Sequence, residues 1–222
     1  GVCSPHSLSH FLLNLRILNP LKALAHHVRF RLIPSPSQFE EGCDLYLIHR
    51  DFVNVHHYEF VTEKLVPNYP CLFEIDDNLS ALPPNHPEFN YYASSIIGAI
   101  DKFLKNFPEL PVITTTQPLA ETLGAPHRPC HLFTNHLPAQ FIAEARRARP
   151  AKQSDAPIRI GFAGTASHTP DLKKIESALL RVAILYRERV EIVLMGAWTQ
   201  DLEACEQVRL IKTPVDYWNY LP

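Results

Sequence analysis

Apolar runs of strand length alternate along the chain with segments whose apolar residues recur every three or four positions. The first pattern is typical of strands buried on both faces, and the second of helices that bury one stripe. We expect strands at 28–33, 44–49, 71–75, 111–115, 130–133, 158–163 and 190–195, with Val2 and Cys3 at the end of an earlier one. Strands alternating with helices predict an α/β fold with parallel sheets flanked by helices.

Helices are expected between these strands. Ser7 should cap the first, whose apolar face consists of Leu8, Phe11, Leu12, Leu15 and Leu18. Asn19-Pro20 should break or kink it, and a short second helix should reach about His26. Further helices are expected at about 55–66, 91–107 and 117–123, the last closed by Gly124.

The clearest unit spans residues 157 to 196. A strand at 158–163 enters the turn Gly164-Thr-Ala-Ser-His168, and a helix follows in which Thr169 suits the N-cap and Pro170 the first helical position. The helix should leave Lys173, Lys174 and Glu176 in solvent and bury one stripe, made of Leu172, Ile175, Leu179, Val182 and Tyr186. Gly161, inside the strand, predicts close packing against a neighbour.

The turn at Gly164 has two interpretations. A glycine beside a helix N-terminus lets a phosphate approach free backbone N–H groups, which predicts a phosphate site. Glycine also serves simply to tighten such a turn, and His168 is then one surface histidine among the twelve of the chain rather than a phosphate donor. The turn taken alone favours the structural interpretation.

A second informative place follows the strand at 71–75. Asp76 and Asp77, with Glu74 upstream, lie at a carboxyl strand end, where ligands of open α/β sheets gather. Strand alternation predicts that Asp76 and Glu74 share one side while Asp77 points to the other. A loop cap is an equal alternative, and a hard cation is a weaker one because no further ligands occur at fixed spacing.

Composition narrows the function classes. The chain has 222 residues, 46% hydrophobic and 20% charged, with a net charge of -2, so no basic face favours nucleic acid as a partner. No apolar run reaches the roughly 18 to 20 residues of a membrane span. The five cysteines form no CxxC and predict small buried side chains in a reducing cytoplasm, with no metal site. The adjacent pairs His26-His27 and His56-His57 point apart on a helix.

A change of composition marks a domain boundary. Residues 139 to 157 are rich in alanine, arginine, lysine and proline, which is typical of a helix that leads into an exposed linker. We therefore expect an N-terminal domain at 1–140, a linker at 141–157 and a second domain at 158–222.

Four segments of the chain follow one another in a recognisable order: Phe73-Glu-Ile-Asp-Asp77, Ile113-Thr-Thr-Thr-Gln-Pro-Leu119, Leu132-Phe-Thr-Asn135, and Ile160-Gly-Phe-Ala-Gly-Thr165 with His168 and Asp171. This order resembles the GT-B glycosyltransferases of the large retaining group, group 1 or family 4-like, over nearly the whole chain. The resemblance implies two Rossmann-like domains that face a cleft. The N-terminal domain would hold the acceptor, and the C-terminal domain a nucleotide sugar.

The resemblance also implies roles for residues. Asp76 and Asp77 would be catalytic, near the reacting sugar, and the substrate-binding residues would be Gly164, Thr165, Ser167, His168, Lys173 and Asn135. The implied reaction moves a sugar from a nucleoside-diphosphate sugar to a hydroxyl of a carbohydrate or lipid-linked glycan, as in polysaccharide biosynthesis. It would proceed with retention, without a metal and without a cofactor.

The chain departs from the family in two places. Thr165 stands where many relatives carry an arginine, which leaves Lys173 or Lys174 to neutralise the diphosphate. The chain stops at Tyr217-Trp-Asn-Tyr-Leu-Pro222, before the segment that holds the donor ribose in the family, so we expect an incomplete second domain and a longer parent chain. A catalytically silent GT-B-like interaction module and an unrelated nucleotide-binding enzyme with two Rossmann-like halves remain alternatives.

Overall fold

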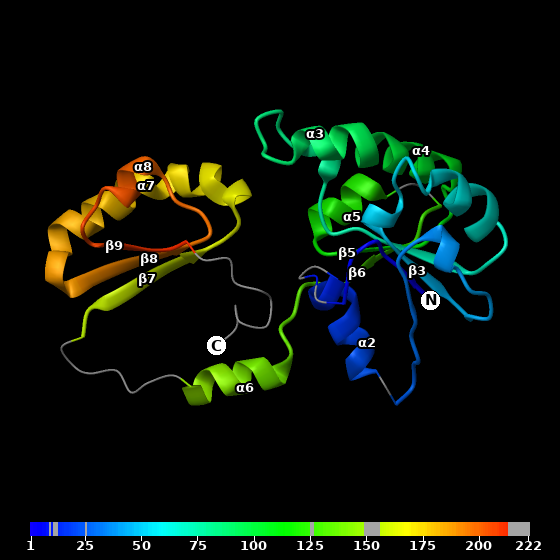
Figure 1. Cartoon of the computed structure of the whole chain (residues 1–222), viewed down its shortest axis with the longest axis horizontal. Coiled ribbons are helices and arrows are strands. Elements are labelled where there is room, and N and C mark those ends of the chain that lie inside the picture. Colours follow the sequence, from blue (N-terminus) through cyan, green and yellow to red (C-terminus); the bar gives the residue numbers. More distant parts are fainter. Residues whose placement is uncertain (9, 11–12, 25, 125–126, 149–155, 213–222) are drawn as a thin grey trace. The chain divides into compact units, whose positions relative to one another are not determined.

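The computed structural model describes residues 1–8, 10, 13–24, 26–124, 127–148 and 156–212. The chain divides into two compact units, one of residues 1–85 and 89–143, and a second of residues 86–88 with the chain from 144 onward. Both units contain parallel strands flanked by helices (Figure 1). The predicted α/β class with parallel sheets is therefore confirmed.

The sheet of unit 1 has six parallel strands. They are β1 Val2–Cys3, β2 Leu32–Ile33, β3 Tyr46–His49, β4 Cys71–Glu74, β5 Val112–Thr114 and β6 Cys130–Leu132. Their order is β2-β1-β3-β4-β5-β6, so the chain runs outward in one direction from β1 to β2 and in the other from β3 to β6. The order reverses between β1 and β3, and ligands of doubly wound sheets bind at such a switch point.

Helices cover both faces of this sheet (Figure 1). One face packs against the π-helical turn Asn14–Leu18 and α2 Asn19–Ala23, and the other against the helical run α3 Phe89–Tyr92, Ala93–Ile97 and α4 Gly98–Asn106. Residues of β3 alternate between the two cores, because Ile48 packs with the α4 side while Leu47 packs with Ile17 and Leu18. This alternation is the period of two that a strand imposes.

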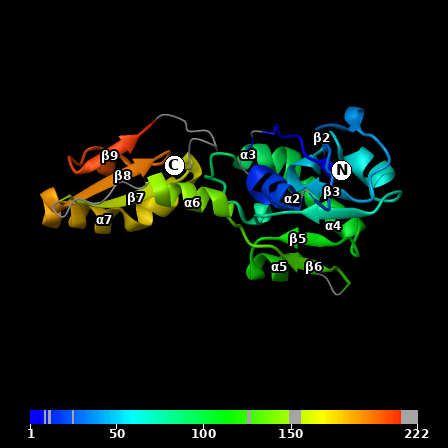
Figure 2. The ribbon, with the colours of Figure 1, turned by 90° about the horizontal axis from the view of Figure 1, so that it is seen from below.

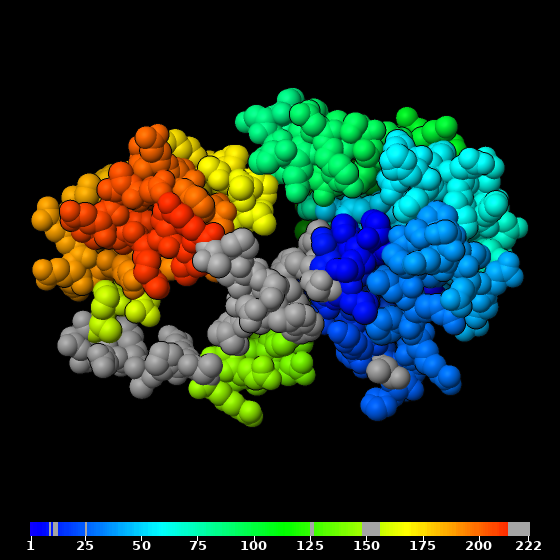
Figure 3. Space-filling view, in the orientation of Figure 1, coloured from blue at the N-terminus to red at the C-terminus, as the bar shows by residue number. Residues whose placement is uncertain are grey.

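The remaining helical elements of unit 1 are short. A π-helical turn at Phe60–Leu65 and 3-10 turns at Pro36–Gln38, Arg50–Phe52 and Leu79–Ala81 connect the strands. Helix α5 Gln117–Leu123 lies beside β5 and β6 (Figure 2), and α6 Ala139–Ala148 follows β6. Thr116 caps α5 through its side chain, as its position before Pro118 favours. In the space-filling view the N-terminal residues pack directly against the segment that follows them (Figure 3).

The predicted N-terminal region is found in part. A π-helical turn ends at Leu18 and α2 begins at Asn19, as expected, but the backbone stays helical between them and α2 ends at Ala23 rather than at about His26. Pro20 falls in the first turn of α2, where its missing N–H is not needed. The strand expected at 28–33 shortens to Leu32–Ile33, because β1 offers it only Val2 and Cys3 as partners. The predicted positions 11 and 12 lie outside the described residues, as do residues 149–155 of the linker expected at 141–157.

Unit 2 is a smaller parallel sheet in the order β7-β8-β9. Its elements are β7 Ile158–Ala163, a 3-10 turn Ala166–His168, α7 Thr169–Tyr186, a 3-10 turn Arg187–Arg189, β8 Val190–Met195, α8 Gln200–Glu203 and β9 Val208–Ile211. Strand β9 was not predicted, and its four residues include an arginine. The core consists of Leu172, Ala183, Val190, Ile192, Leu194 and Leu202.

Helix α7 is rotated relative to the predicted stripe. Ile175 and Tyr186 are exposed, whereas Glu176, expected in solvent, is buried. Hydrogen bonds from Lys173 and Thr199 lower the pKa of the Glu176 carboxyl, which offsets the cost of its burial. Thr169 is already helical and His168 holds the cap position without a side-chain hydrogen bond, because the 3-10 turn runs directly into α7.

The close approach predicted at Gly161 occurs instead at Gly196, another glycine of unit 2. A side chain at Gly161 would meet nothing within 4 Å, so the close packing predicted there is absent. Gly196 instead has φ +77°, and a Cβ on it would lie 2.3 Å from the Gly164 oxygen. The tight contact between the loops after β7 and β8 therefore depends on Gly196.

Candidate functional site

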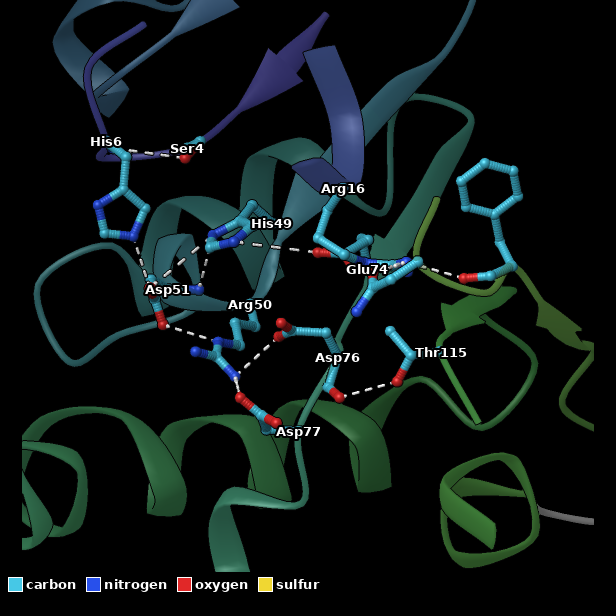
Figure 4. Close-up of polar contacts among 12 residues, drawn as sticks. Ser4, His6, Arg16, His49, Arg50, Asp51, Glu74, Asp76, Asp77 and Thr115 are labelled. Carbon is cyan, nitrogen blue, oxygen red and sulfur yellow. Dashed lines mark hydrogen bonds and ion pairs between the residues drawn. The ribbon is translucent and has the colours of Figure 1, made fainter. Parts of the chain in front are cut away.

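Charged and imidazole side chains gather beyond the carboxyl ends of β1, β3 and β4 (Figure 4). His6 lies beyond β1, Arg50 and Asp51 directly follow β3, and Asp76 and Asp77 lie just beyond β4. Parallel strands all end at the same edge of a sheet, so these segments meet although they are far apart in sequence. The cluster occupies the switch point between β1 and β3, where the topology favours a ligand.

Arg50 is the centre of this cluster. Its Nη1 lies 2.8 Å from Asp76 Oδ1 and 2.7 Å from Asp77 Oδ2, and its Nε lies 3.4 Å from Asp51 Oδ1. The guanidinium also stands over the ring of Tyr92 at 5.8 Å. Burial alone would lower the pKa of Arg50, but the surrounding carboxylates, led by Asp76, raise it above its ordinary value. The arginine therefore stays charged and holds three acids together.

The two aspartates do not point apart as strand alternation predicted. β4 ends at Glu74, so Asp76 and Asp77 lie in the following loop and both turn toward Arg50. Their environments differ, since the Asp76 side chain is 6% exposed and that of Asp77 is 62% exposed. Burial raises the pKa of Asp76, although Arg50 opposes that shift. Asp77 is thus the more accessible of the two carboxylates.

A second arginine ties the strand end to the segment after β6. Arg16 Nε donates to Glu74 Oε1 at 2.8 Å, and Arg16 Nη1 donates to the Phe133 carbonyl at 2.8 Å and to Asn135 Oδ1 at 2.9 Å. Burial raises the pKa of Glu74 to about 7, a shift that Asp76 reinforces and Arg16 opposes. Asn135 therefore joins the same network as the acids after β4.

The third part of the cluster connects β1 to β3. His6 Nε2 and Asp51 Oδ2 share a hydrogen bond of 2.6 Å, and the Asp51 N–H donates to His49 Nδ1 at 3.3 Å. Burial raises the pKa of Asp51, but the His6 hydrogen bond and the charges of His49 and Arg50 outweigh it, so the net shift is downward. His49 is fully buried, and this burial lowers its pKa to about 3.

Sequence reasoning assigned no role to His6, Arg16, His49, Arg50 or Asp51. The available signal was their position, since His49, Arg50 and Asp51 sit at or directly after the apolar run 44–49, just as Asp76 follows the run 71–75. Polar residues at the ends of several parallel strands converge on one edge. Their contacts with His6 and Arg16, however, depend on long-range pairing.

The predicted donor-binding residues lie together in unit 2, at the turn between β7 and α7. Gly164 N donates to the Met195 carbonyl at 3.0 Å, and the hydroxyls of Thr165 and Ser167 share a hydrogen bond of 2.6 Å. The His168 ring covers Gly164, because a Cβ there would lie 3.1 Å from His168 Cβ and Cδ2. The N–H groups of His168 and Thr169 bond within the turn, to Thr165 and Ala166, rather than staying free as the phosphate hypothesis predicted.

The two lysines after the turn are engaged by acids. Lys173 pairs with Glu176 and lies 3.6 Å from Asp201, and Lys174 lies 2.9 Å from Asp171. All of these partners belong to unit 2, and the lysine side chains remain mostly exposed. A bound diphosphate would have to compete with these carboxylates for the lysine charge.

A cavity of about 320 Å³ lies elsewhere in unit 1, lined by residues of the helical run 93–102 together with Val55 and Tyr58. None of the acids around Arg50 lines it. Because its lining offers one charged group, Lys102, it supplies less chemistry than the edge of the sheet. We therefore place the candidate site at the Arg50 cluster.

Comparison with known proteins identifies no family for this chain, so a function can be argued only from its sequence and geometry. No protein-family model matches the chain, and no curated protein matches it. Among the described residues, no helix is both long and apolar enough to cross a bilayer.

Proposed function

We propose that the chain is a glycosyltransferase that moves a sugar from a nucleoside-diphosphate sugar to an acceptor hydroxyl. The observation that carries the proposal is the acid cluster at the switch point of unit 1, with Asp77 exposed and held by a buried arginine. The order of sequence motifs that resembles GT-B enzymes supports the same function. Retention of configuration, a glycan or lipid-linked acceptor and a cytoplasmic location belong to the proposal.

Asp77 is the group that would contact the acceptor. Its carboxylate accepts a hydrogen bond from Arg50 through Oδ2, which fixes its direction. An ionised carboxylate within reach of a sugar hydroxyl can orient that hydroxyl and accept its proton. Asp76 is buried against Arg50 and acts as a positioning residue.

In this proposal, unit 2 binds and stabilises the diphosphate that leaves the sugar. The start of α7 supplies the positive end of a helix dipole beside the hydroxyls of Thr165 and Ser167, and His168 and Lys173 add donors. Such preorganised donors lower a barrier without a metal on the phosphates. His168 would have to swing away from Gly164 for a phosphate to approach the glycine.

Exchange of Asp77 for asparagine tests the acceptor side. We expect Asp77→Asn to lower transfer about 100-fold, because an amide cannot accept the proton. We expect its free energy of unfolding to change by less than about 1 kcal/mol, because the side chain is exposed. Transfer is measured as nucleoside diphosphate released from a panel of nucleoside-diphosphate sugars in the presence of an oligosaccharide acceptor.

The matched control is Asp44→Asn, an exposed aspartate of unit 1 that lies outside the cluster. It should retain wild-type transfer. Equal losses of stability and turnover in Asp77→Asn would show that this residue is only a loop cap. No release by the wild-type chain with any donor of the panel would contradict the enzyme proposal.

Exchange of Gly164 for valine tests the donor side. We expect Gly164→Val to weaken nucleoside diphosphate binding at least about tenfold, since a branched side chain would fill the space beside His168 and block the approach of phosphate. His168→Ala should weaken binding by about 1 to 3 kcal/mol, the loss of one hydrogen bond to a charged group. Calorimetric titration of variants with matched circular dichroism measures both, and unchanged affinity in Gly164→Val would show that the turn is structural.

A catalytically silent interaction module is the second candidate. The arginine that many relatives carry at the position of Thr165 is missing, and Lys173 and Lys174, the candidates for the family's lysine, pair with acids, so both observations favour it. The two functions differ in the donor titration. If the chain is a silent module, the folded wild-type chain should bind no nucleoside diphosphate.

A further inference from the structure

Three potential metal ligands converge at the switch point from separate parts of the chain. One ligand atom from each of His6, His49 and Asp51 lies within 4.8 Å of the others. His6 follows β1, whereas His49 ends β3 and Asp51 follows it. The ring of His10 stacks on that of His6 at 3.6 Å, which holds the His6 ring in its orientation.

The distances between these atoms suit a small cation. Two ligands bound tetrahedrally to zinc at about 2.1 Å lie about 3.4 Å from each other. Asp51 Oδ2 lies 2.6 Å from His6 Nε2 and 4.0 Å from His49 Nδ1, so one separation is shorter and the other longer than this value. Small side-chain rotations would bring all three atoms into coordination.

The orientation of His49 fits a ligand with a supporting carboxylate. Its Nδ1 accepts the Asp51 N–H at 3.3 Å, which places the ring proton on Nε2. A metal ion bound at Nδ1 would take the lone pair that this long hydrogen bond uses. That Nε2 lies 3.9 Å from Glu74 Oε2, and neither atom has a hydrogen-bond partner among the described residues. A ligating histidine ordinarily directs its other N–H at a carboxylate in this way. Glu74 is in turn held by Arg16.

The net charge of the cluster favours the binding of a divalent cation. Four carboxylates, those of Asp51, Glu74, Asp76 and Asp77, face two guanidinium groups, those of Arg16 and Arg50. With all of them ionised, the negative charges exceed the positive ones by two. Arg50 contacts the Oδ1 side of Asp51, which leaves Oδ2 turned toward the histidines.

We propose that His6 Nε2, His49 Nδ1 and Asp51 Oδ2 form a binding site for a divalent transition metal, with zinc as its best fit. Two imidazoles and one carboxylate suit such metals better than magnesium or calcium, which prefer oxygen ligands. Three protein ligands leave an open position for water or another oxygen ligand. The metal replaces the proton between His6 and Asp51 and fastens the loop after β1 to the end of β3.

This site goes beyond the proposed sugar transfer. All of its ligands belong to unit 1, whereas the residues that the proposal assigns to the donor diphosphate belong to unit 2. Its test reads metal binding directly, so that failure of the transferase proposal and failure of the metal proposal are separate outcomes.

Metal titration of the full chain tests the site. The purified chain, first stripped with a chelator, is titrated with Co²⁺, whose visible absorption reports the coordination geometry, and Zn²⁺ then displaces the cobalt. We expect one equivalent to bind at micromolar metal, with no competition from excess Mg²⁺. His6→Ala should weaken the affinity at least about 100-fold, and Glu74→Gln about 10- to 100-fold through His49.

His131→Ala is the matched control, because this histidine is exposed and lies outside the cluster. It should bind cobalt as the wild type does. The His6 side chain is partly exposed, so its removal should leave the fold intact, which circular dichroism checks. Wild-type affinity in His6→Ala, or no saturable cobalt binding by the folded wild-type chain, would overturn the proposal.

Discussion

Replacement of Arg50 by methionine is expected to lower the free energy of unfolding of unit 1 by about 3 to 5 kcal/mol. The guanidinium pairs with Asp76 and with the Oδ1 side of Asp51, whose Oδ2 bonds His6, and the side chains of both aspartates are nearly buried. Methionine fills a similar volume but leaves these carboxylates without their positive partner. The cost is that of uncompensated buried charge rather than of a lost surface ion pair.

Urea denaturation followed by circular dichroism measures the loss, and hydrogen exchange of peptides from unit 1 assigns it to that unit. In Arg50→Met/Asp76→Asn one of the stranded charges is removed, so the double variant should be more stable than Arg50→Met alone. Arg159→Met is the control, since Arg159 pairs with Glu191 at the surface of unit 2 and should cost no more than about 1 kcal/mol. If Arg50→Met also lost no more than about 1 kcal/mol, the central role of Arg50 would be refuted.

Replacement of Gly196 by alanine is expected to lower the free energy of unfolding of unit 2 by about 2 to 5 kcal/mol. A positive φ costs a non-glycine residue about 1 to 2 kcal/mol, and overpacking adds about 1 to 3 kcal/mol. The new Cβ would lie 2.3 Å from the Gly164 oxygen, a backbone atom that cannot rotate away. The loops after β7 and β8 would have to separate, and the Gly164 turn would move with them.

Thermal unfolding followed by tryptophan fluorescence measures this effect, since Trp198 packs against the core of unit 2. Gly161→Ala is the control within the same sheet. Its Cβ would meet nothing within 4 Å, so we expect a change within about 1 kcal/mol, in the stabilising direction. Similar losses of stability in both variants would show that the contact between the two loops does not determine the stability of unit 2.

The positions of most strands could be predicted from local sequence. Apolar runs of four to six residues bounded by turn residues are typical of strands, and the runs at 44–49, 71–75, 158–163 and 190–195 contain strands β3, β4, β7 and β8. Helix α5 was predicted over its full length, because Thr116, Gln117 and Pro118 make a local start signal. The prediction was wrong where a neighbouring strand sets the length of an element. The length of β2, for example, is limited by β1.

The face of a helix was harder to predict than its existence. The stripe of α7 contains apolar residues on more than one side, so periodicity alone allowed a rotation that exposes Ile175 and buries Glu176. Burial of that glutamate depends on Lys173 and Thr199, the second of which comes from the segment before α8. Local spacing does not contain this information.

The sequence by itself determined the α/β class and the position of Asp76 and Asp77 just after a buried strand, because both follow from the period and length of apolar runs. Only the tertiary structure decided which groups these acids meet. The order β2-β1-β3 brings His6 to Asp51 across 45 residues, and helix packing brings Arg16 to Glu74 across 58. Burial of those charges is tolerated only in mutual contact, and strand order, which no local pattern encodes, creates that contact.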